Sequence, residues 1–409
     1  MFRSLFLWLL FSAAITKAGQ LTVCKTCQIS DLSQAVTQAA PHDTINIQVG
    51  TYEAIEIIID KPLTLLGEKD AILDGQTQRH ILNLQSDSVN VIGLTFVNAG
   101  RSFTKDYAAI YAHKVNYFVL KKNRVIEPYF GFLIEKSHYG IISNNTLSGQ
   151  TKTETDSGNG IHLWHCSEVV ISDNETYGLR DGIYFEFVTN SLVKNNNSHN
   201  NIRYGLHFMF SNNDEYTSNN FHHNGAGVAV MFSKFIIMKE NTFAKNWGTA
   251  SYGLLLKEIY DAEVVGNIFD ENTVAIFLEG TGRINYQKNQ FLNNGWGVKV
   301  SGGCYTNRFT ENNFINNALD IAYNSKMNDN EFTHNYWSSY TGYDLDRDGI
   351  GDVPYRPVKL FSYIIGQCPE SIVLLRSLFV DIINFSEKVS PVFTPDNLLD
   401  PMPAMQQLL

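Results

Sequence analysis

The sequence predicts an all-β fold: a single-stranded parallel β-helix of ten or more coils, with an N-terminal capping helix and a C-terminal helical tail. The first observation behind this prediction is a repeat. The pattern N-x-Φ-x-x-N, in which Φ is usually Phe, returns mostly every 22 or 23 residues. Its copies begin at Asn123, Asn145, Asn174, Asn196, Asn219, Asn241, Asn267, Asn289, Asn312 and Asn330. A fixed period in this range is typical of solenoids.

The second observation is that each repeat holds two short stretches of alternating hydrophobicity. One precedes the Asn, as in EVVIS and KFIIM, and the other usually follows a glycine, as in GIHL, GIYF, GLHF and GVAV. Alternation with period two predicts strands, and the Gly and Asn residues between them predict turns. The sequence therefore predicts one repeat per coil of a β-helix. An Asn at the same turn of every coil can form a hydrogen-bonded ladder along the axis.

The two ends of the chain break the repeat. Residues 1–18 carry the basic residue Arg3 near their start and continue with an apolar run that is too short to cross a membrane, which predicts a secretory signal peptide. Residues 19–67 should form the N-terminal cap, with a helix at 31–40, and the first coils, because an open end exposes unpaired strand edges. The repeats fill 68–340. Residues 358–409 should hold a docking helix at 369–388 and an extended or disordered tail from 389 onward.

Charge and cysteine content narrow the classes of function. The formal net charge is −10, which argues against a nucleic-acid partner. There are five cysteines, so at least one stays unpaired. Cys24 and Cys27 form a CxxC motif, which is either a local disulfide or a thiolate pair for a soft metal. The sequence leaves both alternatives open.

The strand that follows each glycine presents one row of side chains to the core. In the pattern G-Φ-x-Φ, the Φ residues point into the coil and x points outward. Phe185 and Phe208 are therefore assigned to the core, and so is the row Phe187, Phe210 and Phe232 two positions further on. On this register Leu206, Phe208 and Phe210 of the strand GLHFMF need no functional explanation.

The outward rows are less uniform and carry a candidate metal site. His207 and Met209 share one outward face, and Met231 should lie beside Met209 on the next coil, about 4.8 Å away. Glu186 flanks Met209 on the previous coil, and His162 lies two coils from His207. Imidazole and thioether are ligands that suit Cu(I). The alternative is a plain protein-interaction face. The polar insertion SGQTKTETDSGN, just before the His162 strand, is a candidate lid over this face.

An Asp-rich segment lies at 341–357. In DLDRDGIGD, the residues Asp344, Asp346, Asp348 and Asp352 occupy the first, third, fifth and ninth positions of a calcium loop, with Gly at the sixth. The twelfth position holds Tyr355 instead of the usual Glu. The pattern favours a structural Ca²⁺ site, with a polar turn as the alternative.

The sequence gives little support for catalysis. Many β-helices cleave polysaccharide with paired carboxylates on one face. Here Arg180 and Asp181 are expected in a turn, and Glu186 has no outward carboxylate on the neighbouring coils. We therefore expect no enzyme activity, and keep a carbohydrate-active β-helix, which would bind or cleave polysaccharide, as the alternative.

Several long motifs resemble the NosD family, the periplasmic accessory proteins of nitrous oxide reductase. They occur in order along nearly the whole mature chain as GNGIHLWHC, LRDGIYFEFVTNS, NIRYGLHFMFSNND, GAGVAVMFS and NYWSSYTGYDLDRDGIGDVPYRP. The resemblance implies a periplasmic right-handed parallel β-helix without catalysis of its own. It also implies an ABC transporter partner (NosF and NosY), support for assembly of the reductase copper centres, and copper passed on from a donor protein.

The resemblance does not say which side chains touch copper, so the copper residues rest on the outward rows alone. It gives the apolar segment 369–388 two interpretations. This segment is either a cap packed on the solenoid or a surface that docks on the membrane permease.

Overall fold

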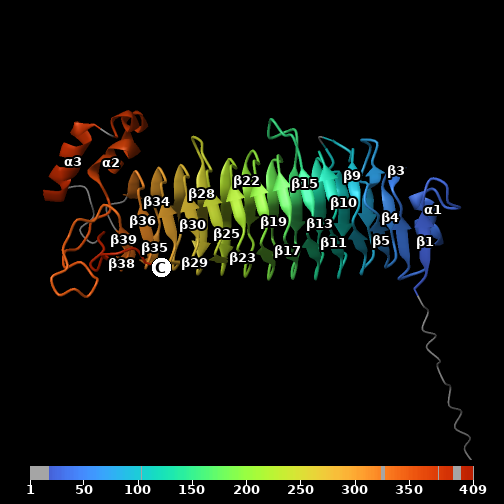
Figure 1. The fold of residues 1–409 in the computed structure, drawn as a ribbon, viewed down its shortest axis with the longest axis horizontal. Helices are drawn as coiled ribbons and strands as arrows, with labels where there is room; N and C mark the ends of the chain where they lie inside the picture. The colour runs from blue at the N-terminus through green and yellow to red at the C-terminus, as the bar shows by residue number, and fades with distance from the viewer. Residues whose placement is uncertain (1–17, 103, 324–327, 376, 390–397, 409) are drawn as a thin grey trace, which may run out of the picture.

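The computed structural model describes residues 18–102, 104–323, 328–375, 377–389 and 398–408. The chain winds into an elongated parallel β-helix with α1 (Leu32–Gln38) at one end and α2 (Leu360–Gln367) and α3 (Leu378–Val389) at the other (Figure 1). Three parallel sheets of 14, 12 and 13 strands run along its length. The all-β class, the coil number and the helices near both ends are confirmed. The predicted signal peptide lies outside the described residues, except for residue 18.

Each full coil contributes one strand to each sheet, so a coil has three strands where the repeat predicted two. The additional strand is the three-residue stretch that follows the repeated Asn. The 14-stranded sheet contains β1 (Gln20–Val23), β2 (Thr44–Ile47), β5 (Thr64–Gly67), β8 (Asn90–Ile92), β11 (Val119–Lys121), β14 (Ile141–Ser143), β17 (Val170–Ser172), β20 (Leu192–Lys194), β23 (Glu215–Thr217), β26 (Ile237–Lys239), β29 (Glu263–Val265), β32 (Asn285–Gln287), β35 (Tyr305–Thr310) and β38 (Asp329–Thr333).

The other two sheets complete the coil. The 12-stranded sheet contains β4 (Ile57–Ile59), β7 (Leu82–Leu84), β10 (Ala108–His113), β13 (Phe130–Glu135), β16 (Asn159–Trp164), β19 (Asp181–Glu186), β22 (Tyr204–Met209), β25 (Ala226–Lys234), β28 (Tyr252–Tyr260), β31 (Val274–Glu279), β34 (Trp296–Ser301) and β37 (Leu319–Tyr323). The 13-stranded sheet contains β3 (Gly50–Glu53), β6 (Ala71–Asp74), β9 (Thr95–Val97), β12 (Arg124–Ile126), β15 (Thr146–Ser148), β18 (Glu175–Tyr177), β21 (Asn197–His199), β24 (Asn220–His222), β27 (Thr242–Ala244), β30 (Ile268–Asp270), β33 (Gln290–Leu292), β36 (Asn313–Ile315) and β39 (Tyr336–Trp337).

Two columns of buried Asn side chains explain the repeated motif. In the first column, each side-chain oxygen accepts from the backbone N–H of the Asn one coil earlier. The second column uses the last Asn of the motif in the same way, from Asn201 to Asn317. Between them, the Φ rings stack in the core, as Phe243 does on Phe269. The predicted ladder is therefore confirmed and doubled.

The end of the first column differs from the sequence prediction. Asn312 donates its backbone N–H to Asn335, not to Asn330. Asn330 instead accepts from Asn307 in a separate short column. The interval of 18 residues was therefore a misalignment, and the period of 23 holds to the last coil. The motif alone could not show this, because Asn330 begins and Asn335 ends the same copy of the motif.

The placement of one Phe row in the core is wrong. Phe187, Phe210 and Phe232 are 39%, 39% and 42% exposed. Each follows a strand residue on the 12-stranded sheet and has a positive φ, between 49° and 54°. This left-handed conformation interrupts the alternation of side chains between the core and the outer face. The side chain therefore points outward, although strict alternation along the sequence would place it in the core. The three rings stack on one another along the surface.

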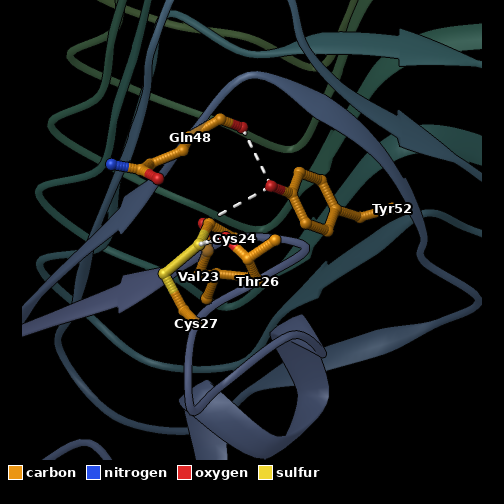
Figure 2. Close-up of a disulfide and its surroundings, with 6 residues drawn as sticks. All are labelled: Val23, Cys24, Thr26, Cys27, Gln48 and Tyr52. Atoms are coloured by element: carbon orange, nitrogen blue, oxygen red, sulfur yellow. Dashed lines mark hydrogen bonds between the residues drawn. A yellow bond between two sulfur atoms is a disulfide. The ribbon is translucent and has the colours of Figure 1, made fainter.

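The N-terminal end is closed by α1 and a disulfide. Asp31 caps the helix by accepting from the N–H of Ser33, and α1 buries Leu32, Ala35 and Val36 against the first coils. Cys24 and Cys27 form a disulfide in the turn that follows β1 (Figure 2). Beneath this turn, the Tyr52 hydroxyl donates to the carbonyl oxygens of Val23 and Gln48 (Figure 2). Of the two alternatives for the CxxC motif, the structure has the disulfide.

The C-terminal end is more elaborate than the single predicted helix at 369–388. Helix α2 ends before Pro369, which has no N–H to continue it, and a 3₁₀ turn (Pro369–Leu374) leads to α3. Phe361 and Ile365 of α2 pack on the outer face of β31, β34 and β37, through Val274, Trp296 and Leu319.

Of the two alternatives for the tail, extended or disordered, the described part, residues 398–408, fits the first: it has no helix and forms isolated β-bridges with Tyr336, Ile350 and Tyr355. Leu398 and Asp400 are fully buried. The Asp400 carboxylate accepts from the backbone and side-chain nitrogens of Asn335 and from Nε1 of Trp337. The tail thereby supplies the acceptor that the last coil of the ladder would otherwise lack. Nothing in the local sequence indicates this contact, because it joins residues 65 positions apart.

Candidate metal site on the outer face

The predicted outward residues meet on the middle of the 12-stranded sheet. The parallel register places Glu186 beside Met209, and Met209 beside Met231. His162, Tyr184 and His207 form the next row across β16, β19 and β22. The adjacency inferred from the repeat is thus present in the structure. Whether these residues bind a metal stays a prediction.

His207 is the unusual member of this group. It is only 4% exposed, and among the described residues neither of its ring nitrogens has a hydrogen-bond partner. Burial, helped by the positive charges of Arg203 and Arg180, lowers the pKa of His207 to about 3. The rings of Tyr184 and Tyr204 contact it at centroid distances of 5.0 and 4.7 Å. The imidazole is therefore neutral at physiological pH and keeps a free lone pair, which is what a metal ligand requires.

Met209 offers the second candidate donor. The Tyr184 hydroxyl donates to its Sδ at 3.6 Å, and both Met209 and Met231 are half-buried. Burial raises the pKa of Tyr184 to about 12, so the hydroxyl remains a donor. A thioether has two lone pairs, so this contact orients the side chain of Met209 and leaves one lone pair available.

His162 is arranged differently from His207. Arg180 donates from Nη2 to Oδ1 of Asn159, and Nδ2 of Asn159 then donates to Nδ1 of His162. Burial and the charge of Arg180 lower the pKa of His162 to about 3, so the ring is neutral and carries its proton on Nε2. In this tautomer the lone pair of Nδ1 is taken up by Asn159, and Nε2 carries a proton instead of a lone pair. The arrangement favours a hydrogen-bonding role for His162.

A further outer row was missed because the sequence search began at the glycine of each strand. The residue before that glycine lies on the outer side, as the contact of Tyr204 with His207 shows. In this row Asp181 is fully buried in strand β19 and not in a turn, which corrects the expectation. Burial raises its pKa, although Arg203 and Arg180 lie 3.9 and 3.5 Å away. The sequence did contain a signal for this row, because the residues at this position on successive coils differ in chemistry: Asn159, Asp181 and Tyr204.

The polar insertion that is the candidate lid forms the loop between β15 and β16, which projects from the solenoid in Figure 1. Its Glu154 lies 3.9 Å from Nε of Arg203, although β22 is two coils away from β16. Thr151 donates its N–H to the carbonyl of Gly178, which ties the loop to the next coil. The loop therefore covers the edge of the face that holds Asp181 and His207.

The exposed Phe stack borders the methionines on the other side. Phe210 and Phe232 directly follow Met209 and Met231 in the chain, and Phe187 follows Glu186. His165 extends the stack by lying flat on Phe187, with ring centroids 4.5 Å apart. Sequence reasoning missed this surface because it assigned the Phe row to the core. Exposed aromatic rings beside a metal-ligand set are suited to contact with a partner protein.

The Asp-rich segment brings together three of its four predicted residues. Oxygens of Asp344, Asp346 and Asp348 lie within 4.8 Å of one another. Asp352 instead accepts from the N–H of Leu345 at 2.7 Å. The carboxylate of Asp344 also accepts from the N–H groups of Arg347 and Gly349, as in a tight loop that closes on its first residue.

The last helix presents an apolar face that other described parts of the chain leave open to solvent. In α3, Leu378, Phe379, Ile382, Phe385 and Val389 are between 56% and 73% exposed. Within the described part of the chain, no helix is long and apolar enough to cross a membrane. Helix α2 packs on the solenoid but precedes the segment 369–388. Within that segment, α3 buries Val380 in the cluster around Phe361 and Ile365 and exposes the five apolar residues named above, so the choice between a cap and a docking surface stays a prediction.

The geometry defines a parallel β-helix with a mixed imidazole and thioether cluster on one outer face. Residues 143–342 match the protein family described as periplasmic copper-binding protein (NosD). A protein of Pseudomonas aeruginosa, named as a probable ABC transporter binding protein NosD, is 29% identical over 380 residues and 88% of both chains. The protein of the same name from Stutzerimonas stutzeri is 27% identical, over 88% of this chain and 86% of the relative. The chain is thus similar to the NosD family over residues 143–342, and to two proteins named NosD over 88% of its length.

Solved structures with a similar fold include enzymes with other names and activities. The mannuronan C-5 epimerase AlgE6 A-module of Azotobacter vinelandii has a TM-score of 0.58 at 12% identity, covering 76% of this chain and 96% of the module. The family 28 exopolygalacturonase of Yersinia enterocolitica has a TM-score of 0.60 at 11% identity, covering 80% of this chain and 79% of the enzyme. At these identities the likeness concerns the fold alone.

Proposed function

We propose that this chain is a periplasmic, non-enzymatic copper-handling factor that helps to assemble the copper centres of nitrous oxide reductase together with an ABC transporter. Its cargo would be Cu(I), received from a donor protein and held transiently by His207, Met209 and Met231, with Glu186 at the border. The family described as periplasmic copper-binding supports the cargo, and relatives named as ABC transporter binding proteins support the partner. Residues 1–18 would direct export.

The observation that carries the proposal is the pair of unpartnered nitrogens on buried His207. A buried polar atom without a hydrogen bond costs about 1–3 kcal/mol, so a site that keeps one is a candidate for a ligand. Neutral imidazole beside two thioethers is a donor set that a soft cation prefers. Tyr184 would hold Met209 in place, and the exposed Phe stack would give the donor or the reductase a surface to contact.

The transporter, by the same proposal the NosF and NosY pair, would bind the apolar face of α3. This face lies at the far C-terminal end of the solenoid, so docking there leaves the copper face free (Figure 1). Replacing Phe379, Ile382 and Phe385 by Ser should release the protein from membranes that contain the transporter. The matched control replaces the exposed Phe187, Phe210 and Phe232 by Ser, which should leave membrane association unchanged.

The experiment that tests the site is anaerobic Cu(I) loading of the purified exported protein in competition with a colorimetric Cu(I) chelator. Replacing His207 by Phe and Met209 and Met231 by Leu should weaken Cu(I) binding by at least about a hundredfold, which corresponds to roughly 2.7 kcal/mol. The control replaces His165 by Phe and the buried core residue Met238 by Leu, and should bind normally. Unchanged affinity in the first variant would remove the site and leave the family assignment intact.

A carbohydrate-active function is the second candidate, favoured by the buried carboxyl of Asp181 with its raised pKa. The spacing argues against hydrolysis, however. Glu186 is five residues further along the same strand, about 16 Å away, whereas paired glycosidase carboxylates lie roughly 5–10 Å apart. We expect no reducing ends from acidic or neutral polysaccharides. Release of reducing ends that disappears in Asp181→Asn would establish the enzyme instead.

We also propose that the Asp344, Asp346 and Asp348 loop takes Ca²⁺ in a structural role. The three carboxylates and the tight turn support this assignment. Saturating Ca²⁺ should raise the unfolding temperature of the wild type, and Asp346→Asn should reduce the rise. Mg²⁺ serves as the control ion, because it demands a smaller octahedral cage.

A further inference from the structure

Two adjacent histidines form an independent cluster on a different sheet. His222 ends strand β24 of the 13-stranded sheet, and His223 begins the turn that follows, with a φ of 54°. This left-handed conformation turns the His223 ring back toward its neighbour. The Nδ1 atoms of the two rings are 2.9 Å apart, and the rings are nearly perpendicular at 81°. The proposed Cu(I) residues lie on the 12-stranded sheet, so this pair is not part of that cluster.

The surroundings of His222 fix its tautomer. Oδ1 of Asn197 accepts from Nδ2 of Asn220 at 3.2 Å and lies 3.1 Å from Nε2 of His222. Because this oxygen can only accept, Nε2 of His222 carries the proton. Its Nδ1 then holds a lone pair that points at His223. A ligating histidine typically donates its other N–H to an oxygen in this way, which orients the ring and makes the free nitrogen more basic.

The orientation of the His222 ring is also fixed by stacking. His222 lies flat on His199 with centroids 4.8 Å apart, and His199 lies flat on Tyr177 at 5.1 Å. Burial lowers the pKa of His222, with smaller contributions from the charges of His199, His223 and Lys245. His222 is therefore held rigid, while exposed His223 can exchange its proton with water.

We propose that His222 and His223 form a surface site for a square-planar divalent metal, Cu(II) in the first place, bound through both Nδ1 atoms. With metal–nitrogen bonds of about 2.0 Å, two nitrogens 2.9 Å apart subtend an angle of about 90° at the metal. That is the angle of neighbouring positions in a square plane, which Cu(II) and Ni(II) prefer with nitrogen ligands. Cu(I) with two imidazoles would instead draw the nitrogens to opposite sides.

Binding needs two changes at the site: the rings reorient so that both Nδ1 lone pairs point at the metal instead of along the line between the two nitrogens, and one proton moves. The proton that His223 shares with Nδ1 of His222 moves to the solvent-facing Nε2 of His223, so the ring stays neutral and no charge is lost. Water would fill the remaining metal positions, since these two imidazoles supply only two ligands. A site with two open positions releases its metal readily to a partner that offers more ligands. The inference stands whether or not His207 binds Cu(I).

The test is titration of the full exported chain with Cu(II) under air, followed by electron paramagnetic resonance. The wild type should show one bound Cu(II) with coupling to two nitrogens. His222→Ala and His223→Ala should each lose this signal, and Asn197→Ala should weaken binding about tenfold, because the orienting oxygen is removed. His165→Ala is the matched control, since His165 is also an exposed histidine in a left-handed turn, and it should bind normally.

The outcomes separate this site from the Cu(I) proposal. His207→Phe should keep the Cu(II) signal, and His223→Ala should keep Cu(I) binding under anaerobic loading. An unchanged Cu(II) affinity in His222→Ala and His223→Ala would overturn the inference. So would an equal loss in His165→Ala, because binding would then follow exposed histidines in general and not the 2.9 Å pair.

Discussion

The Asn columns inside the coils and the outer face of β19–β25 both bury polar side chains, but they treat them differently. Asn219 in the first column donates to the carbonyl of Val193 and to Asn241, and it accepts from Asn196. On the outer face His207 and Asp181 are as deeply buried. Within the described residues, the ring nitrogens of His207 and one carboxylate oxygen of Asp181 have no hydrogen-bond partner, and that oxygen has only the ion pair with Arg180 at 3.5 Å. Satisfied groups stabilise the solenoid, and unsatisfied groups remain where a ligand is expected. The comparison separates the part that holds the fold from the part proposed to carry function.

The largest effect should come from breaking the Asn column in its middle. Asn219→Ala removes one acceptor and two side-chain donors, and it leaves buried groups on both neighbouring coils without partners. We expect the free energy of unfolding to fall by roughly 4 kcal/mol, measured by urea denaturation. Asn220→Ala is the control, because the exposed side chain of Asn220 bonds only to Asn197 at the surface, and it should cost less than about 0.5 kcal/mol. Equal losses of unfolding free energy in Asn219→Ala and Asn220→Ala would contradict the view that the hydrogen bonds of the Asn column stabilise the fold.

The end of the column should be nearly as sensitive. Asp400→Leu leaves the backbone N–H of Asn335 and the indole N–H of Trp337 without their acceptor, and it removes one of the three acceptors of Nδ2 of Asn335. We expect a loss of about 3 kcal/mol and faster proteolysis of the C-terminal tail, followed by mass spectrometry. Asp381→Leu, at the start of α3, should leave tail proteolysis unchanged. A protected tail in Asp400→Leu would mean that the apolar contacts of Leu398 suffice to hold it.

The contrast has exceptions in the interior, among them Tyr216, Tyr286 and Asp214, and pH should reveal the last of these. Asp214 is buried and one of its oxygens has no partner, and burial raises its pKa to about 8 from an ordinary value of 3.8. Between these values the folded chain binds more protons than the unfolded chain, so stability falls as the pH rises. Relative to Asp214→Asn, the wild type should lose about 2 kcal/mol between pH 5 and pH 7, measured by urea denaturation at each pH. Exposed Asp173→Asn should show no such difference.

The smallest expected effect has the opposite sign. His207→Phe replaces two unpartnered nitrogens with carbon in an aromatic pocket, so we expect the unfolding free energy to rise by about 1 kcal/mol while Cu(I) affinity falls. His165→Phe at the surface is the control for both measurements, and neither should change. A clear loss of stability in His207→Phe would show that the imidazole has structural partners, and would weaken the contrast between the two regions.

The architecture and most of the candidate site could be predicted from the sequence, because they depend on the repeat length and on the alternation of inward and outward side chains within each strand. The repeat of 22 or 23 residues fixes which residues of neighbouring coils lie side by side, so Met209 and Met231 could be paired before any coordinates. Alternation within a strand fixes which side chains face outward, which separated His207 from Phe208. Both the repeat length and the alternation recur in every coil along the axis, so one sequence contains the same pattern many times.

The sequence by itself determined the solenoid, its Asn column and the outward placement of His207, Met209 and Met231. Tertiary structure alone decided that Phe187, Phe210 and Phe232 are exposed, because a left-handed residue at a corner breaks the alternation that holds within strands. It also decided that Asp400 closes the column and that the His207 nitrogens have no partner. Whether a buried polar atom has a hydrogen-bond partner depends on groups that come from distant positions in the sequence. Neither the repeat length nor the alternation within strands determines those contacts.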